Sequence, residues 1–186
     1  MYDERILQPR AFIVPRSSFH IPELRTPMSL IARLIYRALV WKERQRALRR
    51  EAAAQPSKSG ERAAHLVTGE RGETLAYWYL RQVGYTIVAR NRRARSGAGE
   101  VDLIGWDGPT LAFVEVKSRT SEATGPPELA VSRAKQKRIA KAAYDYLRRL
   151  KARPASYRFD IVSVFWDRDT GLRVRLIKNA FTPGPH

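Results

Sequence analysis

Two carboxylates and a lysine recur at short spacing within residues 99–119, GEVDLIGWDGPTLAFVEVKSR. The turn-forming pair Gly108-Pro109 separates two apolar stretches, a pattern that predicts a β-hairpin of two buried strands. When the hairpin folds about this pair, Asp102 of the first strand lies opposite Glu115 of the second. Side chains alternate between the two faces of a strand, so both carboxylates point to the same side. A register shifted by one residue would separate them.

The same register places Glu100 opposite Lys117, on the face that carries the two carboxylates. Both faces of the hairpin are otherwise apolar, and doubly buried strands rarely carry carboxylates unless these are paired or bind a metal. The alternative is a solvent-exposed ladder of charge pairs, which charge count alone would favour. The apolar surroundings favour the floor of a cleft instead.

Metal-assisted hydrolysis is the chemistry that this pattern favours. Hard divalent cations such as Mg2+ bind carboxylate oxygens, backbone carbonyls and water. Asp102 and Glu115 can share one ion, and the carbonyl of Val116 can complete the protein's ligands. Lys117 would point into the same site, where it can orient a water molecule or offset negative charge on a phosphate. The Glu-x-Lys pattern alone is common by chance.

Several further motifs follow one another in a fixed order along residues 69–181. They are Gly72-Glu73 with Ala76, Arg90-Asn91, the segments GEVDLI and FVEVKSR, and Arg158-Phe159-Asp160. Together they resemble the PD-(D/E)xK nuclease superfamily and, within it, the small bacterial YraN family, which is similar to archaeal Holliday-junction resolvases. The sequence departs from the superfamily name at Val101, where a proline would stand.

This resemblance implies an α/β fold with a restriction-endonuclease-like αβββαβ core, in which helices flank a mixed central sheet. It implies a divalent-metal-dependent endonuclease that hydrolyses DNA, with branched or repair intermediates as candidate substrates, Mg2+ or Mn2+ as cofactor and a homodimer as a candidate assembly. It places metal-site acids at Asp102 and Glu115, the lysine at Lys117 and a further acid at Glu73. From the sequence alone, Glu73 is explained as an acid in the first turns of a helix, where it suits the helix dipole.

The chain carries a large excess of positive charge. Its 186 residues include 35 Lys and Arg against 18 Asp and Glu, which gives a net charge of +17 and a pI near 10.9. A field of this sign favours polyanions, either nucleic acid or an anionic membrane, although ordinary solubility is the simpler alternative. The second hypothesis for function is therefore a non-catalytic nucleic-acid-binding module that retains the nuclease fold.

Candidate phosphate contacts come from a basic loop predicted over residues 90–99, from the end of the hairpin, and from a helix predicted over 128–150. The expected nucleic-acid-binding residues are Arg92, Arg93, Arg95, Arg119, Arg133, Lys137 and Lys141. Arginine binds phosphate through two parallel hydrogen bonds and so can position a backbone without reading sequence. Gln136 lies on the apolar side of the helix and is a candidate for reaching the site. The simpler alternative is a solvated loop and helix face.

The remaining elements frame the hairpin. The pattern predicts a helix over 68–83 and a strand over 86–89 before it, then a strand over 157–166 and a half-exposed edge strand over 172–181. Asp160 falls inside the apolar run of the first of these later strands. A buried acid there needs a partner, such as an arginine, and is expected to be structural first.

The nuclease-like domain is predicted over residues 61–186 and an extension over 1–60. Within the extension, 1–27 is expected to be irregular, 28–51 a basic amphipathic helix, and 52–60 a linker. One face of the helix is predicted to carry Leu30, Leu34, Ile35, Ala38, Leu39 and Trp41. Basic residues interrupt the helix too often for a membrane span. It is expected to dock on the domain or a partner, with peripheral contact to an anionic membrane or nucleic acid as the alternative.

Two further observations concern the chain as a whole. Cysteine is absent, which excludes disulfides and thiolate chemistry and fits a cytoplasmic protein. Met28 is the second of two methionines, and translation from Met28 is an alternative to translation from Met1.

Overall fold

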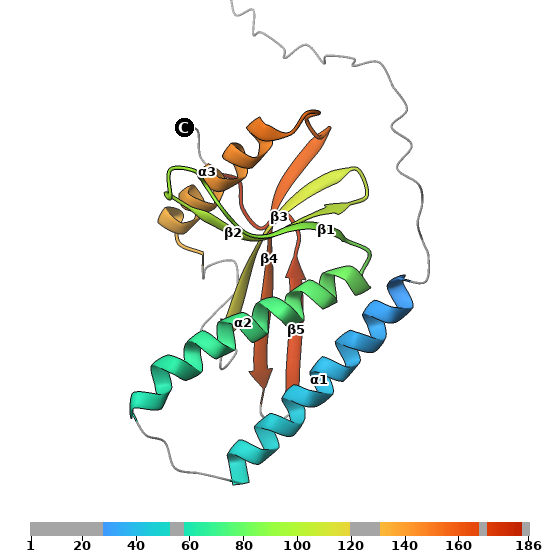
Figure 1. Cartoon of the computed structure of the whole chain (residues 1–186), viewed down its shortest axis with the longest axis vertical. Coiled ribbons are helices and arrows are strands. Elements are labelled where there is room, and N and C mark those ends of the chain that lie inside the picture. The colour runs from blue at the N-terminus through green and yellow to red at the C-terminus, as the bar shows by residue number, and fades with distance from the viewer. Residues whose placement is uncertain (1–27, 53–57, 120–130, 168–170, 184–186) are drawn as a thin grey trace, which may run out of the picture.

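The structure is a computed structural model that describes residues 28–52, 58–119, 131–167 and 171–183 (Figure 1). Its elements are α1 (Met28–Ala52), α2 (Lys58–Gln82), β1 (Thr86–Arg93), β2 (Glu100–Asp107), β3 (Thr110–Arg119), α3 (Arg133–Arg149), β4 (Ser156–Asp167) and β5 (Gly171–Ile177). From α2 to β4 the order of helices and strands is the predicted one. The irregular segment expected over 1–27 lies outside the described residues.

The five strands form one mixed sheet in the order β1-β2-β3-β4-β5. Neighbouring strands are antiparallel except β3 and β4, which run parallel. Parallel neighbours need a crossover connection, and α3 lies in the connection between these two strands. The prediction of an α/β protein with a mixed central sheet is therefore confirmed.

The β2–β3 hairpin has the predicted register next to its turn. Leu103 pairs with Val114, and Ile104 pairs with Phe113. All four side chains are fully buried, so the hairpin is covered on both faces, as its apolar pattern predicts. The next position outward on each strand holds one of the two candidate acids.

One helix covers each face of the sheet. On one face, α3 inserts Ile139 and Ala143 into a buried cluster with Phe113. On the other face, α2 contributes Leu75 and Leu80 to a second cluster. The hairpin therefore lies between two hydrophobic clusters. Its side chains point alternately into the cluster on the α3 side and the cluster on the α2 side.

The helix α1 runs beside α2 and also contacts β5, on the face of the sheet away from α3 (Figure 1). Its Ala32 is only 1% exposed, and Tyr36 and Val40 pack against the core on the α2 side. The favoured prediction, a helix docked on the domain, is confirmed. No helix in the described ranges is both long enough and apolar enough to cross a bilayer.

The predicted orientation of α1 is wrong in part. Leu34 and Trp41, expected on one apolar face together with Leu39, are 66% and 64% exposed. The helix has apolar residues on two sides, and the domain packs against the side that carries Ala32 and Tyr36. A periodicity search cannot tell which of two apolar sides faces inward.

Several predicted boundaries also need correction. The helix α2 begins at Lys58 rather than near residue 68, so the linker expected over 52–60 is shorter, and residues 53–57 lie outside the description. Alanine, glutamate and arginine at positions 61–64 favour helix, and the single Gly60 does not prevent it. The helix α3 begins at Arg133 rather than 128, because the hydroxyl of Ser132 caps it by accepting a hydrogen bond from a backbone amide.

The strand β1 continues to Arg93, beyond the predicted end at residue 89, because its pairing with β2 extends that far. The basic loop is correspondingly shorter and spans residues 94–99. Arg92 therefore lies on a strand and not in the predicted loop. The edge strand β5 is confirmed, with Leu172 and Val174 partly buried and Arg173 exposed between them, but it ends at Ile177 rather than near residue 181.

Candidate active site

Glu115 on β3 is the centre of the candidate site. Its side chain is only 2% exposed, and its Oε1 accepts ion pairs from Lys117 Nζ at 2.8 Å and Lys135 Nζ at 3.0 Å. The other oxygen, Oε2, is buried and has no hydrogen-bond partner among the described residues. Burying a carboxylate oxygen without a donor or a cation is costly. Glu115 is therefore positioned to bind a further positive charge.

Asp102 on β2 lies beside Glu115. Its Oδ2 accepts a hydrogen bond of 2.7 Å from the backbone N–H of Val116, which links the two strands next to Glu115. Burial, followed by the charge of Glu115, raises the pKa of Asp102 to about 7, although the Val116 bond and Lys135 oppose the rise. The buried Glu115 and the partly buried Asp102 repel each other when both are ionised, and a cation between them would relieve the repulsion.

Glu73 approaches the same place from α2, and its charge adds to the rise in the pKa of Asp102. The helix can come this close because residue 72 is glycine: a Cβ at Gly72 would lie 1.8 Å from Ser118 Oγ on β3. The alternative role for Glu73, as an acid at the start of a helix, is wrong, since α2 begins about four turns earlier at Lys58.

The donor set fits a hard divalent cation such as Mg2+ or Mn2+. Asp102 and Glu115 supply carboxylate oxygens, one of them buried without a donor, and oxygen donors are what these ions prefer. In the described part of the chain, no three His, Cys, Asp or Glu side chains form a group that could hold an ion. Glu73 lies near this acid pair and stays a predicted site residue. The carbonyl of Val116 remains a predicted ligand.

Lys135 is the site residue that the sequence analysis missed. Gln136, the next residue on α3, was expected to reach the site, but its amide donates to the Val131 carbonyl at 2.9 Å. A signal for Lys135 exists in the sequence. It lies four residues before the fully buried Ile139, on the inner side of the helix, where an unpaired lysine is rare.

The predicted phosphate contacts are distributed over β1, the loop that follows it, and α3. The side chains of Arg92, Arg93, Arg95, Arg133, Lys137 and Lys141 are all exposed. Arg93 Nε pairs with Glu100 Oε2 at 3.1 Å across β1 and β2, whereas Lys117 pairs with Glu115. Arg119 ends β3, and its side chain lies outside the description.

A basic groove of about 570 Å3 lies between the 94–98 loop and α3. It is lined by Ala94, Arg95, Ser96, Ala98, Lys141, Tyr144, Asp145 and Arg148. The loop is fixed to the helix at two points. The backbone N–H of Arg95 donates to Asp145 Oδ2 at 3.2 Å, and a Cβ at Gly99 would lie 1.9 Å from the carbonyl oxygen of Arg138. Only glycine allows this close approach.

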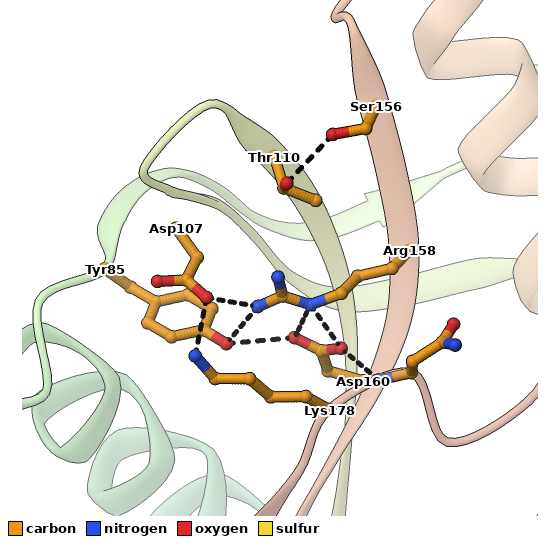
Figure 2. Close-up of polar contacts among 8 residues, drawn as sticks. Tyr85, Asp107, Thr110, Ser156, Arg158, Asp160 and Lys178 are labelled. Atoms are coloured by element: carbon orange, nitrogen blue, oxygen red, sulfur yellow. Dashed lines mark hydrogen bonds and ion pairs between the residues drawn. The ribbon is translucent and has the colours of Figure 1, made fainter.

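Asp160 on β4 is fully buried, and both of its carboxylate oxygens accept hydrogen bonds (Figure 2). It accepts hydrogen bonds from Arg158 Nε at 2.9 Å, Tyr85 Oη at 3.0 Å and the N–H of Asn179 at 2.9 Å. Arg158 also pairs with Asp107 at the end of the hairpin. The structural role predicted for Asp160, with an arginine as partner, is supported by these contacts.

These observations define a class: an α/β protein with a buried carboxylate–lysine site on a mixed sheet. The family model described as "Uncharacterised protein family UPF0102" matches residues 72–164, which include every side chain of the site from Glu73 to Lys135. The chain belongs to the UPF0102 family, the YraN-type family that its motifs resemble.

Individual relatives support this assignment. The chain is 55% identical to a UPF0102 protein of Solibacter usitatus over 96 residues, which are 52% of this chain and 73% of the relative. It is 51% identical to a UPF0102 protein of Symbiobacterium thermophilum over 113 residues, 61% and 94% of the two chains. A UPF0102 protein of Geotalea uraniireducens is 42% identical over 124 residues, 67% and 96% of the two chains. The helix α1 precedes the range that the family model matches.

Proposed function

We propose that this protein is a divalent-metal-dependent endonuclease that hydrolyses phosphodiester bonds in DNA. The observation that carries the proposal is the buried Glu115, whose Oε2 has no donor in the described structure, beside Asp102 with its raised pKa. Two such acids at the end of a hairpin, with lysines beside them, suit metal-assisted phosphoryl chemistry better than a structural ion pair. The element order from α2 to β4 supports a restriction-endonuclease-like core.

Each side chain has a role in this proposal. Asp102 and Glu115 hold Mg2+ or Mn2+, with the carbonyl of Val116 as a further ligand. When bound, the ion acidifies a water molecule and offsets charge on the phosphate. Lys117 and Lys135 stabilise negative charge that develops on the phosphate oxygens. Glu73 orients the attacking water by accepting a hydrogen bond from it.

The basic groove and the exposed arginines support a nucleic-acid substrate. Arg95, Lys141 and Arg148 line the groove, and Arg133 and Lys137 continue the basic surface along α3. Positive charge spread over a loop and a helix binds a phosphate backbone without reading its sequence. We propose branched or repair intermediates as the substrate class and a homodimer as the active assembly.

The test is a Mg2+ and Mn2+ titration by calorimetry, followed by cleavage assays on linear, single-stranded, flapped and four-way DNA. Asp102→Asn and Glu115→Gln are the test variants, and Glu100→Gln, at a neighbouring acid paired with Arg93, is the control. We expect metal binding and cleavage in the wild type and in the control, and neither in the test variants. Metal binding that survives both substitutions would rule out this site.

A non-catalytic nucleic-acid-binding module is the second candidate. The observation that favours it is the pair of lysines on Glu115 Oε1, because these already compensate the carboxylate charge. In that case the wild type would bind DNA in a salt-sensitive manner, bind no Mg2+ and cleave none of the four substrates. Cleavage that is lost in Glu115→Gln would exclude it.

A further inference from the structure

The outer side of α1 carries apolar side chains that the described structure leaves uncovered. Leu30, Ile31, Leu34 and Trp41 are 62%, 51%, 66% and 64% exposed. We call these four residues the α1 stripe. Leu34 and Trp41 lie four and eleven residues after Leu30, and Ile31 lies three residues before Leu34, so all four fall along one side of the helix. An exposed apolar stripe of this length is characteristic of an interaction surface.

Positive charges border the α1 stripe. The side chains of Arg33, Arg37, Lys42 and Arg44 are all exposed. The acid in this part of the helix, Glu43, is partly buried and pairs with Arg46. The outward side of α1 therefore combines apolar and basic side chains.

We propose that the α1 stripe attaches the protein to the surface of an anionic lipid membrane. A helix that lies in the membrane interface needs leucine or tryptophan on one side and lysine or arginine beside them. The apolar side chains enter the boundary between headgroups and acyl chains, and the basic ones contact lipid phosphates. This is attachment in the plane of the surface, in keeping with the lack of a membrane-crossing helix among the described elements.

The charges beside the α1 stripe favour a membrane over a second copy of the chain or nucleic acid. A second copy packed stripe to stripe would bring Arg33 and Arg37 close to the same charges of its partner. Nucleic acid would use the charges but offers no apolar surface for Leu30 and Leu34. A membrane with anionic headgroups matches both features.

The packing of α1 makes the surface available in the folded protein. Ala32 and Tyr36 hold the helix on the domain, so the α1 stripe faces outward without any rearrangement. Because α1 lies on the α2 side of the sheet and the basic groove lies on α3, attachment leaves the groove uncovered. The helix also precedes residue 72, where the family match begins, so the proposed attachment uses residues other than those of the proposed nuclease site.

The test is co-sedimentation of the full chain with vesicles of phosphatidylcholine alone and of phosphatidylcholine with phosphatidylglycerol. We expect binding to the mixed vesicles that weakens with salt, and little binding to the neutral ones. Leu34→Ser with Trp41→Ser should lower partitioning about tenfold or more, because binding scales with the apolar area buried. Both side chains are exposed, so the variant should fold, which circular dichroism checks.

The matched control is Val83→Ser with Val88→Ser, which removes two exposed apolar side chains outside α1. It should bind vesicles as the wild type does, and both variants should keep the salt-sensitive binding of duplex DNA. Vesicle binding that is equal with neutral lipid, or unchanged by the α1 substitutions, would overturn the proposal. So would a wild-type dimer in sedimentation velocity that becomes monomeric in Leu34→Ser with Trp41→Ser and binds no vesicles.

Discussion

At the scale of single residues, the protein carries two buried acids on adjacent strands with different surroundings. Asp160 accepts hydrogen bonds from Arg158, Tyr85 and the Asn179 backbone. Glu115 has both of its lysines on one oxygen and no donor on the other. A buried carboxylate with donors on both oxygens stabilises the fold, whereas one with an oxygen that lacks a donor is available for binding. The contrast supports Glu115 as the central acid of the proposed metal site.

Lys117→Met and Lys135→Met should each destabilise the fold by about 1 to 2 kcal/mol, because each leaves Glu115 with one cation. The double variant should lose more than the sum, since it leaves a buried charge unpaired. Urea denaturation of the four proteins measures this coupling. Strict additivity would mean that the two lysines do not share Glu115, and Mg2+ should recover part of the loss in the double variant.

Asp102 gives a prediction for pH. Its pKa is about 7 in the folded protein against the ordinary value of 3.8, so the folded state holds this proton more tightly. Without metal, its contribution to stability therefore falls as pH rises from about 4 to about 7, by on the order of a few kcal/mol in total. Asp102→Asn keeps an oxygen for the Val116 N–H but has no charge. It should raise the melting temperature at pH 8 and change it little at pH 4.

Thermal unfolding in EDTA at pH 4, 6 and 8 checks this dependence. Added Mg2+ should stabilise the wild type at pH 8, because the bound ion offsets the charges of the two carboxylates. It should leave Asp102→Asn unchanged, because that variant lacks one of the two carboxylates that would hold the ion. A difference in melting temperature that is the same at all three pH values would contradict the raised pKa of Asp102.

At the scale of elements, the contact between α2 and β3 sets the position of Glu73. Gly72→Ala should destabilise the protein by about 1 to 3 kcal/mol, because the new methyl group would meet Ser118. Gly69→Ala is the matched control on the same helix, where a Cβ meets nothing within 4 Å. It should be neutral or stabilising by up to about 1 kcal/mol.

Urea denaturation measures both glycine variants. Ser118→Ala combined with Gly72→Ala should recover most of the lost stability, since it removes the nearest clashing atom. A Gly72→Ala variant as stable as the wild type would show that α2 and β3 are not held this close, and a double variant no more stable than Gly72→Ala would show that Ser118 is not the cause of the loss.

The elements also show which parts of the structure a sequence can predict. The hairpin register followed from the Gly108-Pro109 turn, because turn length fixes which residues face each other. Lys135 was missed because its role depends on how α3 lies over β3, which is a tertiary contact between distant segments. The inward side of α1 was not predictable either, because two sides of that helix are apolar and the choice depends on α2.

At the scale of the whole molecule, the net charge of +17 predicts salt-dependent binding of nucleic acid. Arg95 and Lys141 line the basic groove. The substitutions Arg95→Gln and Lys141→Gln should each reduce the slope of log affinity against log salt by about one. Arg173→Gln and Arg175→Gln remove the same charge from the exposed edge strand β5 and are the controls. Fluorescence anisotropy of a labelled duplex measures the slope.

If all four substitutions reduced the slope equally, binding would depend on total charge and not on the groove. A reduction confined to Arg95→Gln and Lys141→Gln would locate the phosphate path along the 94–98 loop and α3. The loop is held against α3 by the hydrogen bond from the Arg95 N–H to Asp145, so the groove is part of the fold.

The place of α1 in the fold also has an evolutionary consequence. The helix lies outside the family match, and its main contacts are with α2 and β5, on the face away from α3. An ancestor could gain or lose such a helix without a compensating change at Asp102, Glu115 or the lysines. Selection can therefore act on the surface that α1 presents separately from the residues of the candidate site.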